Sequence, residues 1–306
     1  MNFLIVGDAL RDLKPRSDSS LEMVREALMR THTVHWCTQE DLFLWDGRVH
    51  ARVTNLTECP EHSFPAAENL ADPQPLNSYD SIWIRKDPPV DQAYTAMCHL
   101  LALEEKNVPM LNKPSVLLRY HEKLLPMEAV EAGFLTQEEV IPTFLPLGKR
   151  MVIPKDFPRG ETVTKPLWGF AGKEVKLLPS AQTPEPYFLL QPFQKKIHDT
   201  GDRRVFILDG EVAGSFVRLP AAGDIRANLA VGGRAEMRVM TKKEQALTER
   251  VGNFLKEVGI SFAGVDLIQE KISEINITSP TGLITFRSLG GPRLVSRYLD
   301  LVESLV

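Results

Sequence analysis

The chain has 306 residues, of which 43% are hydrophobic and 25% are charged, a composition that excludes a disordered chain and allows two or three subdomains with proper cores. The formal net charge is −4, from 36 basic and 40 acidic residues, so nucleic acid is not an expected partner. Local basic clusters, such as Lys195–Lys196 and Arg203–Arg204, instead suit a small anionic ligand.

The cysteine pattern and the start of the chain indicate a cellular location. Cys37, Cys59 and Cys98 are far apart, with neither a metal-binding spacing nor a disulfide framework, which favours a reducing compartment. No apolar run in the sequence approaches the ~18 residues of a membrane span. The opening MNFLIVGDAL lacks the basic start of a signal peptide and predicts a first strand. We therefore expect a cytoplasmic protein without a membrane partner.

Strands and helices alternate in the first part of the chain. The patterns predict strand Phe3–Val6, helix Leu21–Arg30, strand Thr33–Cys37, a hairpin over Leu42–Val53, strand Ser81–Ile84, helix Gln92–Glu105, strand Val108–Leu111 and helix Ser115–Leu124. The stretch from Cys59 to Ser78, rich in Pro, Asn and Glu, is expected to be a surface connection. This alternation predicts a parallel α/β domain, whose ligands bind where strands end, near Asp8, Arg85 and Lys86.

The middle of the chain has few helical patterns. Short strands are predicted at Thr162–Lys165, Val175–Leu178 and Phe188–Pro192, after a segment, Val140–Ile153, that is rich in Pro and β-formers. These strands predict a small antiparallel subdomain. The loop Pro166–Gly172 contains Gly169 and Gly172, and its backbone N–H groups can close over phosphates.

The last part of the chain combines strands with a long loop of small residues. We expect strands Arg204–Leu208 and Glu211–Leu219, the Gly- and Ala-rich stretch Pro220–Gly233, helix Lys242–Val258, a hairpin and a closing helix near Pro292–Leu305. A long loop of small residues is what a lid over an active site requires.

The hairpin near the end of the chain carries candidate metal ligands. Strands at Val265–Ile268 and Ser273–Ile277 would bring Asp266 beside Glu274 and Asn276, which share a strand face because they are two residues apart. Two carboxylates and an amide oxygen are hard ligands that suit Mg²⁺. The alternative is an ordinary hairpin with an acidic solvent face.

Several basic residues are candidates for binding anions. Lys123, expected late in a helix, and Lys165, at a strand end, can hold phosphates as compact charges. Arg204 and Arg218 lie on consecutive predicted strands and Arg226 lies in the long loop, where arginines can clamp carboxylates or phosphates. The alternative for each is a solvated surface charge.

A set of motifs in a fixed order resembles one family. The segments IRKDPP (84–89), LNKP (111–114), EKL (122–124), KPLWGFAG (165–172), GDRRVFILDGE (201–211), RANLAVGGR (226–234), GVDLI (264–268) and EINITSPT (274–281) resemble those of bacterial-type glutathione synthetase. The resemblance runs almost end to end and implies an α/β chain with the ATP-grasp fold, α+β in its C-terminal part. It implies an N-terminal parallel α/β domain (1–118), a small antiparallel lid subdomain (119–194), and a C-terminal catalytic subdomain (195–306) whose mixed sheet carries the Mg²⁺ site.

The resemblance also implies an activity and its ligands. The family joins γ-glutamylcysteine to glycine at the expense of ATP through an acylphosphate. The implied cofactors are ATP and two Mg²⁺ ions, with Mn²⁺ as an alternative, and the implied assembly is a homotetramer. The implied site residues are Asp266, Glu274 and Asn276 for the metal, Lys123, Lys165, Gly169 and Gly172 for the phosphates, Gln191, Pro192 and Phe193 for adenine, Arg204, Arg218 and Arg226 for catalysis, and Arg85, Asn228, Ser279 and Thr281 for the peptide and glycine.

Some positions depart from the family pattern. Trp168 stands where the phosphate loop usually has aspartate, and Ala171 replaces the first of two paired glycines. Ile225 and Ala227 stand where smaller or more polar residues are usual, and residues 282–286 are more apolar than expected. Two alternatives therefore stay open beside an active glutathione synthetase. One is a ligase with an altered dipeptide or amine, and the other is a nucleotide-binding protein that no longer catalyses.

Overall fold

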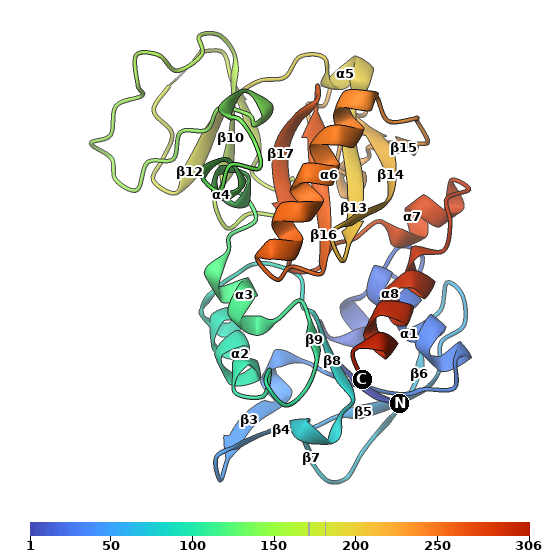
Figure 1. Cartoon of the computed structure of the whole chain (residues 1–306). Helices are drawn as coiled ribbons and strands as arrows, with labels where there is room; N and C mark the ends of the chain where they lie inside the picture. Colours follow the sequence, from blue (N-terminus) through green and yellow to red (C-terminus); the bar gives the residue numbers. More distant parts are fainter. Residues whose placement is uncertain (171, 181) are drawn as a thin grey trace.

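The computed structural model describes the whole chain except residues 171 and 181, so the expectation for Ala171 lies outside the described residues. Figure 1 shows an N-terminal sheet in the lower half of the molecule and the lid and C-terminal sheets in the upper half. No helix in the described part of the chain has the length and apolar character needed to cross a membrane.

The N-terminal sheet has the strand order β6-β5-β2-β1-β8-β9. Its strands are β1 (Asn2–Gly7), β2 (Thr33–Cys37), β5 (Thr54–Glu58), β6 (Ala66–Asn69), β8 (Ser81–Arg85) and β9 (Met110–Leu111). The pairs β1–β2, β1–β8 and β8–β9 are parallel, as predicted. At one edge β5 and β6 pair antiparallel, so the sheet as a whole is mixed.

The stretch Cys59–Ser78 is exposed over much of its length, as predicted, but the structure adds pairing that the sequence does not indicate. It contains β6, β7 (Gln74–Pro75) and the 3-10 turn η3 (Leu76–Ser78). β6 pairs with β5, and β7 joins the hairpin of β3 (Leu42–Trp45) and β4 (Arg48–Ala51). Edge pairing depends on backbone groups that almost any residue supplies, so composition does not reveal it.

Helices from both ends of the chain cover the N-terminal sheet. These are α1 (Ser19–Met29), α2 (Gln92–Ala102), α3 (Pro114–Arg119) and α8 (Leu294–Ser304). The Asp18 carboxylate caps α1 by accepting the N–H groups of Ser20 and Leu21. α8 lies along α1, as Figure 1 shows, and its Tyr298 packs edge-on against Trp83 of β8. The final helix of the chain therefore belongs to the packing of the first sheet.

The predicted helix over Ser115–Leu124 is wrong in its second half. α3 ends at Arg119 because Tyr120 adopts an extended backbone, and a new helix, α4 (Leu125–Glu131), starts with proline in its first turn. Lys123 therefore lies in the turn between the two helices rather than late in a helix.

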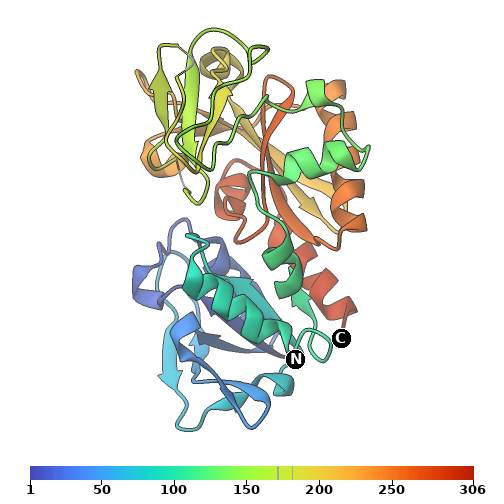
Figure 2. The same ribbon diagram turned by 90° about the vertical axis from the view of Figure 1, so that its left-hand side faces the viewer.

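The lid sheet has the order β11-β10-β12, formed by β10 (Thr162–Pro166), β11 (Lys176–Leu178) and β12 (Phe188–Pro192). All its pairs are antiparallel, which confirms the predicted small antiparallel subdomain. In Figure 2 this sheet lies beside the C-terminal sheet and above the N-terminal sheet.

The 3-10 turns elsewhere are η1 (Leu10–Asp12), η2 (Gln39–Asp41), η4 (Gln137–Glu139) and η5 (Leu229–Val231).

The C-terminal sheet has the order β15-β14-β13-β16-β17. Its strands are β13 (Asp202–Leu208), β14 (Glu211–Leu219), β15 (Arg234–Glu236), β16 (Phe262–Ile268) and β17 (Lys271–Asn276), with helices α5 (Ile197–Thr200), α6 (Lys242–Glu257) and α7 (Leu283–Ser288) around it. These strands pair antiparallel, and a parallel bridge from Val140 to Ile272 makes the edge at β17 mixed. α6 packs its buried face against β13 and β14.

Candidate active site

A row of charged side chains crosses the C-terminal sheet on one face. Arg204 of β13 lies directly opposite Asp266 of β16, and Asp266 lies directly opposite Glu274 of β17. Asp202 lies opposite Arg218 of β14. Directly paired residues of neighbouring strands point to the same face, so strand register alone assembles this row.

Asp266 is the centre of a buried ion network. Arg204 donates from Nε to Oδ1 at 2.6 Å and from Nη2 to Oδ2 at 3.0 Å. Arg218 reaches Asp266 Oδ2 at 3.0 Å and donates to Asp202 Oδ2 at 2.5 Å. Burial opposes ionisation of Asp266, but Arg204 and Arg218 outweigh it and lower its pKa to about 2. Burial raises the pKa of Asp202 to about 6 against the opposing effect of Arg218.

The predicted metal ligands form a compact set of oxygen donors. Asn276 donates its Nδ2 to Asp266 Oδ2 at 3.1 Å and to Gly264 O at 3.0 Å, which leaves its own oxygen for a ligand. Among the described residues, no group of three or more His, Cys, Asp or Glu side chains is placed to hold a metal. Two carboxylates with an amide oxygen fit Mg²⁺, which is usually bound by one or two carboxylates together with phosphate oxygens.

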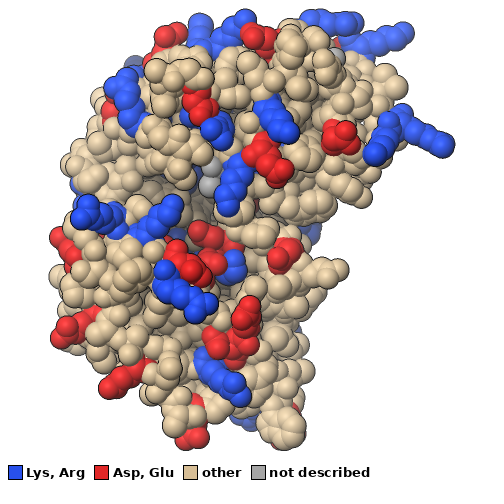
Figure 3. Space-filling model, turned by 180° about the vertical axis from the view of Figure 1, so that it is seen from behind, with Lys and Arg blue, Asp and Glu red and all other residues tan. Residues whose placement is uncertain are grey.

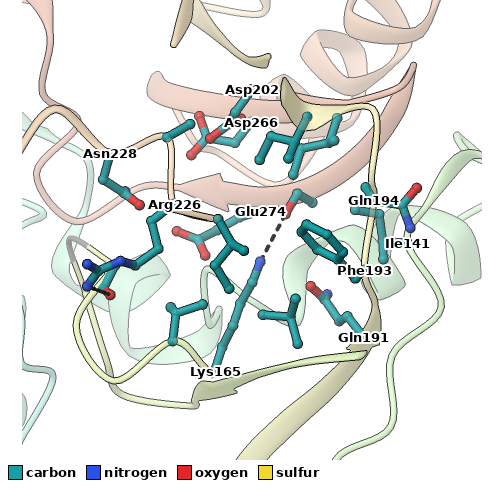
Figure 4. A pocket seen from close by; sticks show the side chains of 18 of the residues that line it. Ile141, Lys165, Gln191, Phe193, Gln194, Asp202, Arg226, Asn228, Asp266 and Glu274 are labelled. Carbon is teal, nitrogen blue, oxygen red and sulfur yellow. Dashed lines mark hydrogen bonds between the residues drawn. The ribbon is translucent and has the colours of Figure 1, made fainter. Parts of the chain in front are cut away.

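Both predicted phosphate-binding lysines reach one cavity, shown in Figure 4. Lys165 extends from β10 and donates to Ser273 Oγ of β17 at 3.2 Å. Lys123, only 7% exposed, donates to Gly169 O at 2.5 Å. Burial lowers the pKa of Lys165, and Glu274 acts against this effect. The cavity thus brings ammonium groups from the turn before α4 and from the lid sheet toward the acidic row.

The predicted adenine hinge forms another wall of the cavity. Gln191, Pro192 and Phe193 line it, together with Ile141 and Gln194. Gln191 is buried on β12 and donates its amide to Thr143 Oγ1 at 2.9 Å. A wall with an aromatic ring and a fixed amide suits a flat heterocycle.

Two loops from different subdomains meet over the cavity. Gly172 has φ +74°, and a Cβ there would lie 2.6 Å from Asn228 Oδ1. Arg226 donates to Gly172 O at 3.4 Å and pairs with Asp224 at 2.8 Å. The loop 166–172 and the long loop 220–234 are therefore in contact. Figure 3, a view from behind Figure 1, shows basic and acidic side chains gathered around a hollow in the middle of the molecule.

Of the residues predicted for the peptide and glycine sites, Asn228 lines this cavity, whereas Arg85, Ser279 and Thr281 lie outside its lining. Arg85 is 4% exposed and donates to Pro280 O at 3.0 Å and to Ser20 Oγ at 3.1 Å. Arg204 Nη1 donates to Thr281 O at 3.0 Å, while Ser279 is buried next to it in the same segment. In this structure both guanidinium groups hold the backbone of residues 280–281.

Trp168 lies apart from the cavity. It is 46% exposed, packs against Tyr187 with ring centroids 5.2 Å apart, and lines a groove with Pro89, Val90 and residues of α2. The indole that replaces the expected aspartate therefore faces the N-terminal domain rather than the space between the lysines and the hinge.

The sequence interpretation missed Asp202 and Glu122. Asp202 lines the cavity, and within the described structure its buried Oδ1 has no hydrogen-bond partner. Its position two residues before Arg204 on one strand was the available signal, because that spacing places both side chains on one face. Glu122, next to Lys123, accepts hydrogen bonds from the segment after Asn276, a long-range contact with no local pattern.

The profile described as "Prokaryotic glutathione synthetase, N-terminal domain" matches residues 1–118, and "Prokaryotic glutathione synthetase, ATP-grasp domain" matches residues 155–290. The glutathione synthetase of Prochlorococcus marinus subsp. pastoris is 32% identical over 321 aligned positions, covering 100% of both chains. The chain belongs to the prokaryotic glutathione synthetase family. The glutathione synthetase of Escherichia coli is also 32% identical, covering 98% of this chain and 97% of its own.

Membership of the glutathione synthetase family makes the chain an ATP-dependent ligase that forms C–N bonds. Solved structures with the same fold include a D-cycloserine synthetase, with a TM-score of 0.65, 15% identity and full coverage of both chains. The D-alanine–D-alanine ligase of Bacillus anthracis has a TM-score of 0.57 at 11% identity, covering 99% of this chain and 96% of that one. At such identities the likeness confirms the ATP-grasp fold alone.

Proposed function

We propose that this ligase joins γ-glutamylcysteine to glycine through an acylphosphate and releases ADP and phosphate. The observation that carries the proposal is one cavity that combines two lysines, an acidic row and a hinge, in a chain related end to end to glutathione synthetases. Lys123 and Lys165 would offset phosphate charge from two sides. Gln191–Phe193 would hold adenine.

In the proposed reaction the cysteinyl carboxylate attacks the γ-phosphate, and ADP leaves. The glycine amine then attacks the acyl carbon, loses a proton, and releases phosphate. Asp266, Glu274 and Asn276 would hold Mg²⁺, which offsets the charge on the phosphate oxygens when bound. Arg204 and Arg218, next to Asp266, are the proposed catalytic arginines for the transferred phosphate and the peptide.

Water has to be excluded while the acylphosphate exists, because hydrolysis would waste it. The contact of Gly172 with Asn228 and Arg226 supports this role for the two loops, since all three residues line the cavity. Arg226 and Asn228 are also proposed to face the peptide, with Arg85, Ser279 and Thr281 ordering the segment on which glycine binds.

The decisive experiment measures ADP release from Mg-ATP with γ-glutamylcysteine and glycine, omitting each in turn. Release that needs both, with glutathione detected by mass spectrometry, supports the proposal. Release only with other dipeptides or amines would replace it with a ligase of altered specificity. The position of Trp168, beside the N-terminal domain rather than in the cavity, makes that the second candidate.

We further propose that the site binds two Mg²⁺ ions, which Mn²⁺ can replace, and that the partners are small molecules alone. The proposed assembly is a homotetramer, and the proposed location is the cytoplasm. Light scattering on the purified protein would give the assembly, and a mass other than that of four chains of 34.4 kDa would contradict it.

A further inference from the structure

The segment that follows the predicted metal ligands is held from outside the sheet. Glu122 Oε1 accepts hydrogen bonds from Ile277 N at 2.8 Å, Thr278 N at 2.9 Å and Thr278 Oγ1 at 2.8 Å. The backbone carbonyl of Glu122 also accepts from Ile275 N at 3.1 Å. One residue of the turn before α4 therefore fixes the backbone on both sides of Asn276.

The same peptide group is held from its other side by Asn112. Asn112 Nδ2 donates to Ile277 O at 2.8 Å and to Phe262 O at 2.7 Å. Its Oδ1 accepts from the N–H groups of Ser261 and Phe262, each at 2.9 Å. Asn112 is 4% exposed, so these bonds form away from water. Ile277 is thus held at its N–H by Glu122 and at its C=O by Asn112.

The turn that carries Glu122 also carries Lys123. Lys123 Nζ donates to Gly169 O in the loop 166–172, and Gly169 lines the same cavity as Ser273 and Glu274 of β17. Through the Glu122 carboxylate and the Lys123 ammonium, this turn therefore links the end of β17 to the loop 166–172. A shift of this turn would move both together, because consecutive residues share their backbone.

Three donors converge on Oε1 of Glu122: the N–H groups of Ile277 and Thr278 and the hydroxyl of Thr278. Hydrogen bonds to a carboxylate are roughly twice as strong as neutral ones, so these three bonds hold Ile277 and Thr278 firmly in place.

We propose that Glu122, with Asn112 as its counterpart, is a positioning residue that keeps Glu274 and Asn276 at the spacing Mg²⁺ requires while Lys123 faces the same phosphates. This rests on the proposed assignment of Mg²⁺ and ATP to the cavity, but not on the identity of the joined substrates. Partners that orient metal ligands typically contribute about 10–100-fold to metal affinity.

The test uses the full chain, Mg²⁺ and the β,γ-imido analogue of ATP, which binds without turnover. Calorimetry gives the Mg²⁺ concentration that half-saturates nucleotide binding. We expect Glu122→Gln, which keeps the shape but removes the charge, to raise that concentration at least about tenfold. The matched control is Glu131→Gln, an exposed glutamate on the following helix, for which no change is expected.

Hydrogen exchange of the ligand-free protein provides a second readout. The amides of Ile277 and Thr278 should exchange faster in Glu122→Gln, while those of β16 stay as in the wild type. If Glu122→Gln does not fold, Thr278→Val removes one of the three donors and should raise the Mg²⁺ requirement by a smaller factor.

The proposal would be overturned if the folded variants needed the same Mg²⁺ concentration as the wild type for half-saturation of nucleotide binding. A lower melting temperature with that concentration unchanged would overturn it as well. A wild-type protein that binds Mg²⁺ and the analogue but does not join γ-glutamylcysteine to glycine would contradict the proposed function and leave this test intact. If the wild-type protein bound the nucleotide analogue equally well with and without Mg²⁺, both the proposed function and the proposed role of Glu122 would be contradicted.

Discussion

Arg204 and Asp266 face each other across β13 and β16, and the guanidinium spans both carboxylate oxygens, with Nε 2.6 Å from Oδ1 and Nη2 3.0 Å from Oδ2. The proposed metal ligand Asp266 thus has its counter-charge within hydrogen-bond distance. Two planar groups joined in this way are pre-aligned, so Asp266 keeps one orientation.

The acid stability of the protein should reflect this pair. Arg204 and Arg218, against the effect of burial, lower the pKa of Asp266 to about 2, below its value in an unfolded chain of about 3.9. The stabilisation is therefore present above about pH 4 and is lost as the pH falls toward 2, on the order of 2 kcal/mol. Urea unfolding from pH 5 to pH 2 should show a smaller pH slope in Asp266→Asn than in the wild type. Equal slopes would contradict the assignment.

Glu274 should be essential for ligation and dispensable for folding. It lines the cavity, and no salt bridge of Glu274 is found within the described residues. Because Glu274→Gln removes a carboxylate that is proposed to bind the metal, we expect ADP release to fall by about 100-fold or more and the melting temperature to change little. Glu270→Gln, in the turn of the same hairpin, is the control and should stay active. Full activity of Glu274→Gln would remove the metal assignment.

Contact between the two loops can be tested with a pair of glycine substitutions. Gly172 and Gly223 both have positive φ, but an added Cβ at Gly172 meets Asn228, while at Gly223 nothing lies within 4 Å. Gly223→Ala should cost only the backbone penalty, about 1–2 kcal/mol of stability. Gly172→Ala should in addition raise the KM for ATP by roughly tenfold, since about 1.4 kcal/mol of closure would be lost. Equal KM values for the two variants would argue against the loop contact.

Trp168 should not contribute to nucleotide affinity. Its indole packs on Tyr187 and faces Pro89 and α2 across a groove. We expect Trp168→Phe to bind ATP within about twofold of the wild type, a difference below 0.5 kcal/mol. The KM for the dipeptide is the quantity expected to change, because this side of the loop faces the N-terminal domain. A large loss of ATP affinity would place the indole at the nucleotide.

Local signals in the sequence were enough for most elements. The bounds of Thr33–Cys37 and Glu211–Leu219 follow from β-branched runs and the Asp209–Gly210 turn, and the structure has the same bounds. Asp266 and Glu274 were expected side by side because their hairpin has a short polar turn, and the register confirms it. Periodicity and turn chemistry are properties of neighbours along the chain, so the sequence contains them directly.

Periodicity and turn chemistry do not predict contacts between residues that are far apart in the sequence. Nothing near Glu122 indicates that its carboxylate will meet Ile277, and nothing near Arg85 indicates that Pro280 will accept its hydrogen bond. The break after Arg119 was also missed, since the helical pattern continues through Leu124 while Tyr120 leaves the helix. Such features depend on the tertiary fold, which overrides local preference.

The packing of α8 on α1 has a consequence for the order in which the molecule is made. During synthesis residues 1–118 emerge well before Leu294–Ser304. Trp83 and the side of α1 that contacts α8 therefore lack their packing partners until Tyr298 and its neighbours have been made. Contacts between residues so distant along the chain slow folding, because a long loop must close before they form. The surface of α1 and of Trp83 that α8 covers therefore stays uncovered until the last residues of the chain have been made.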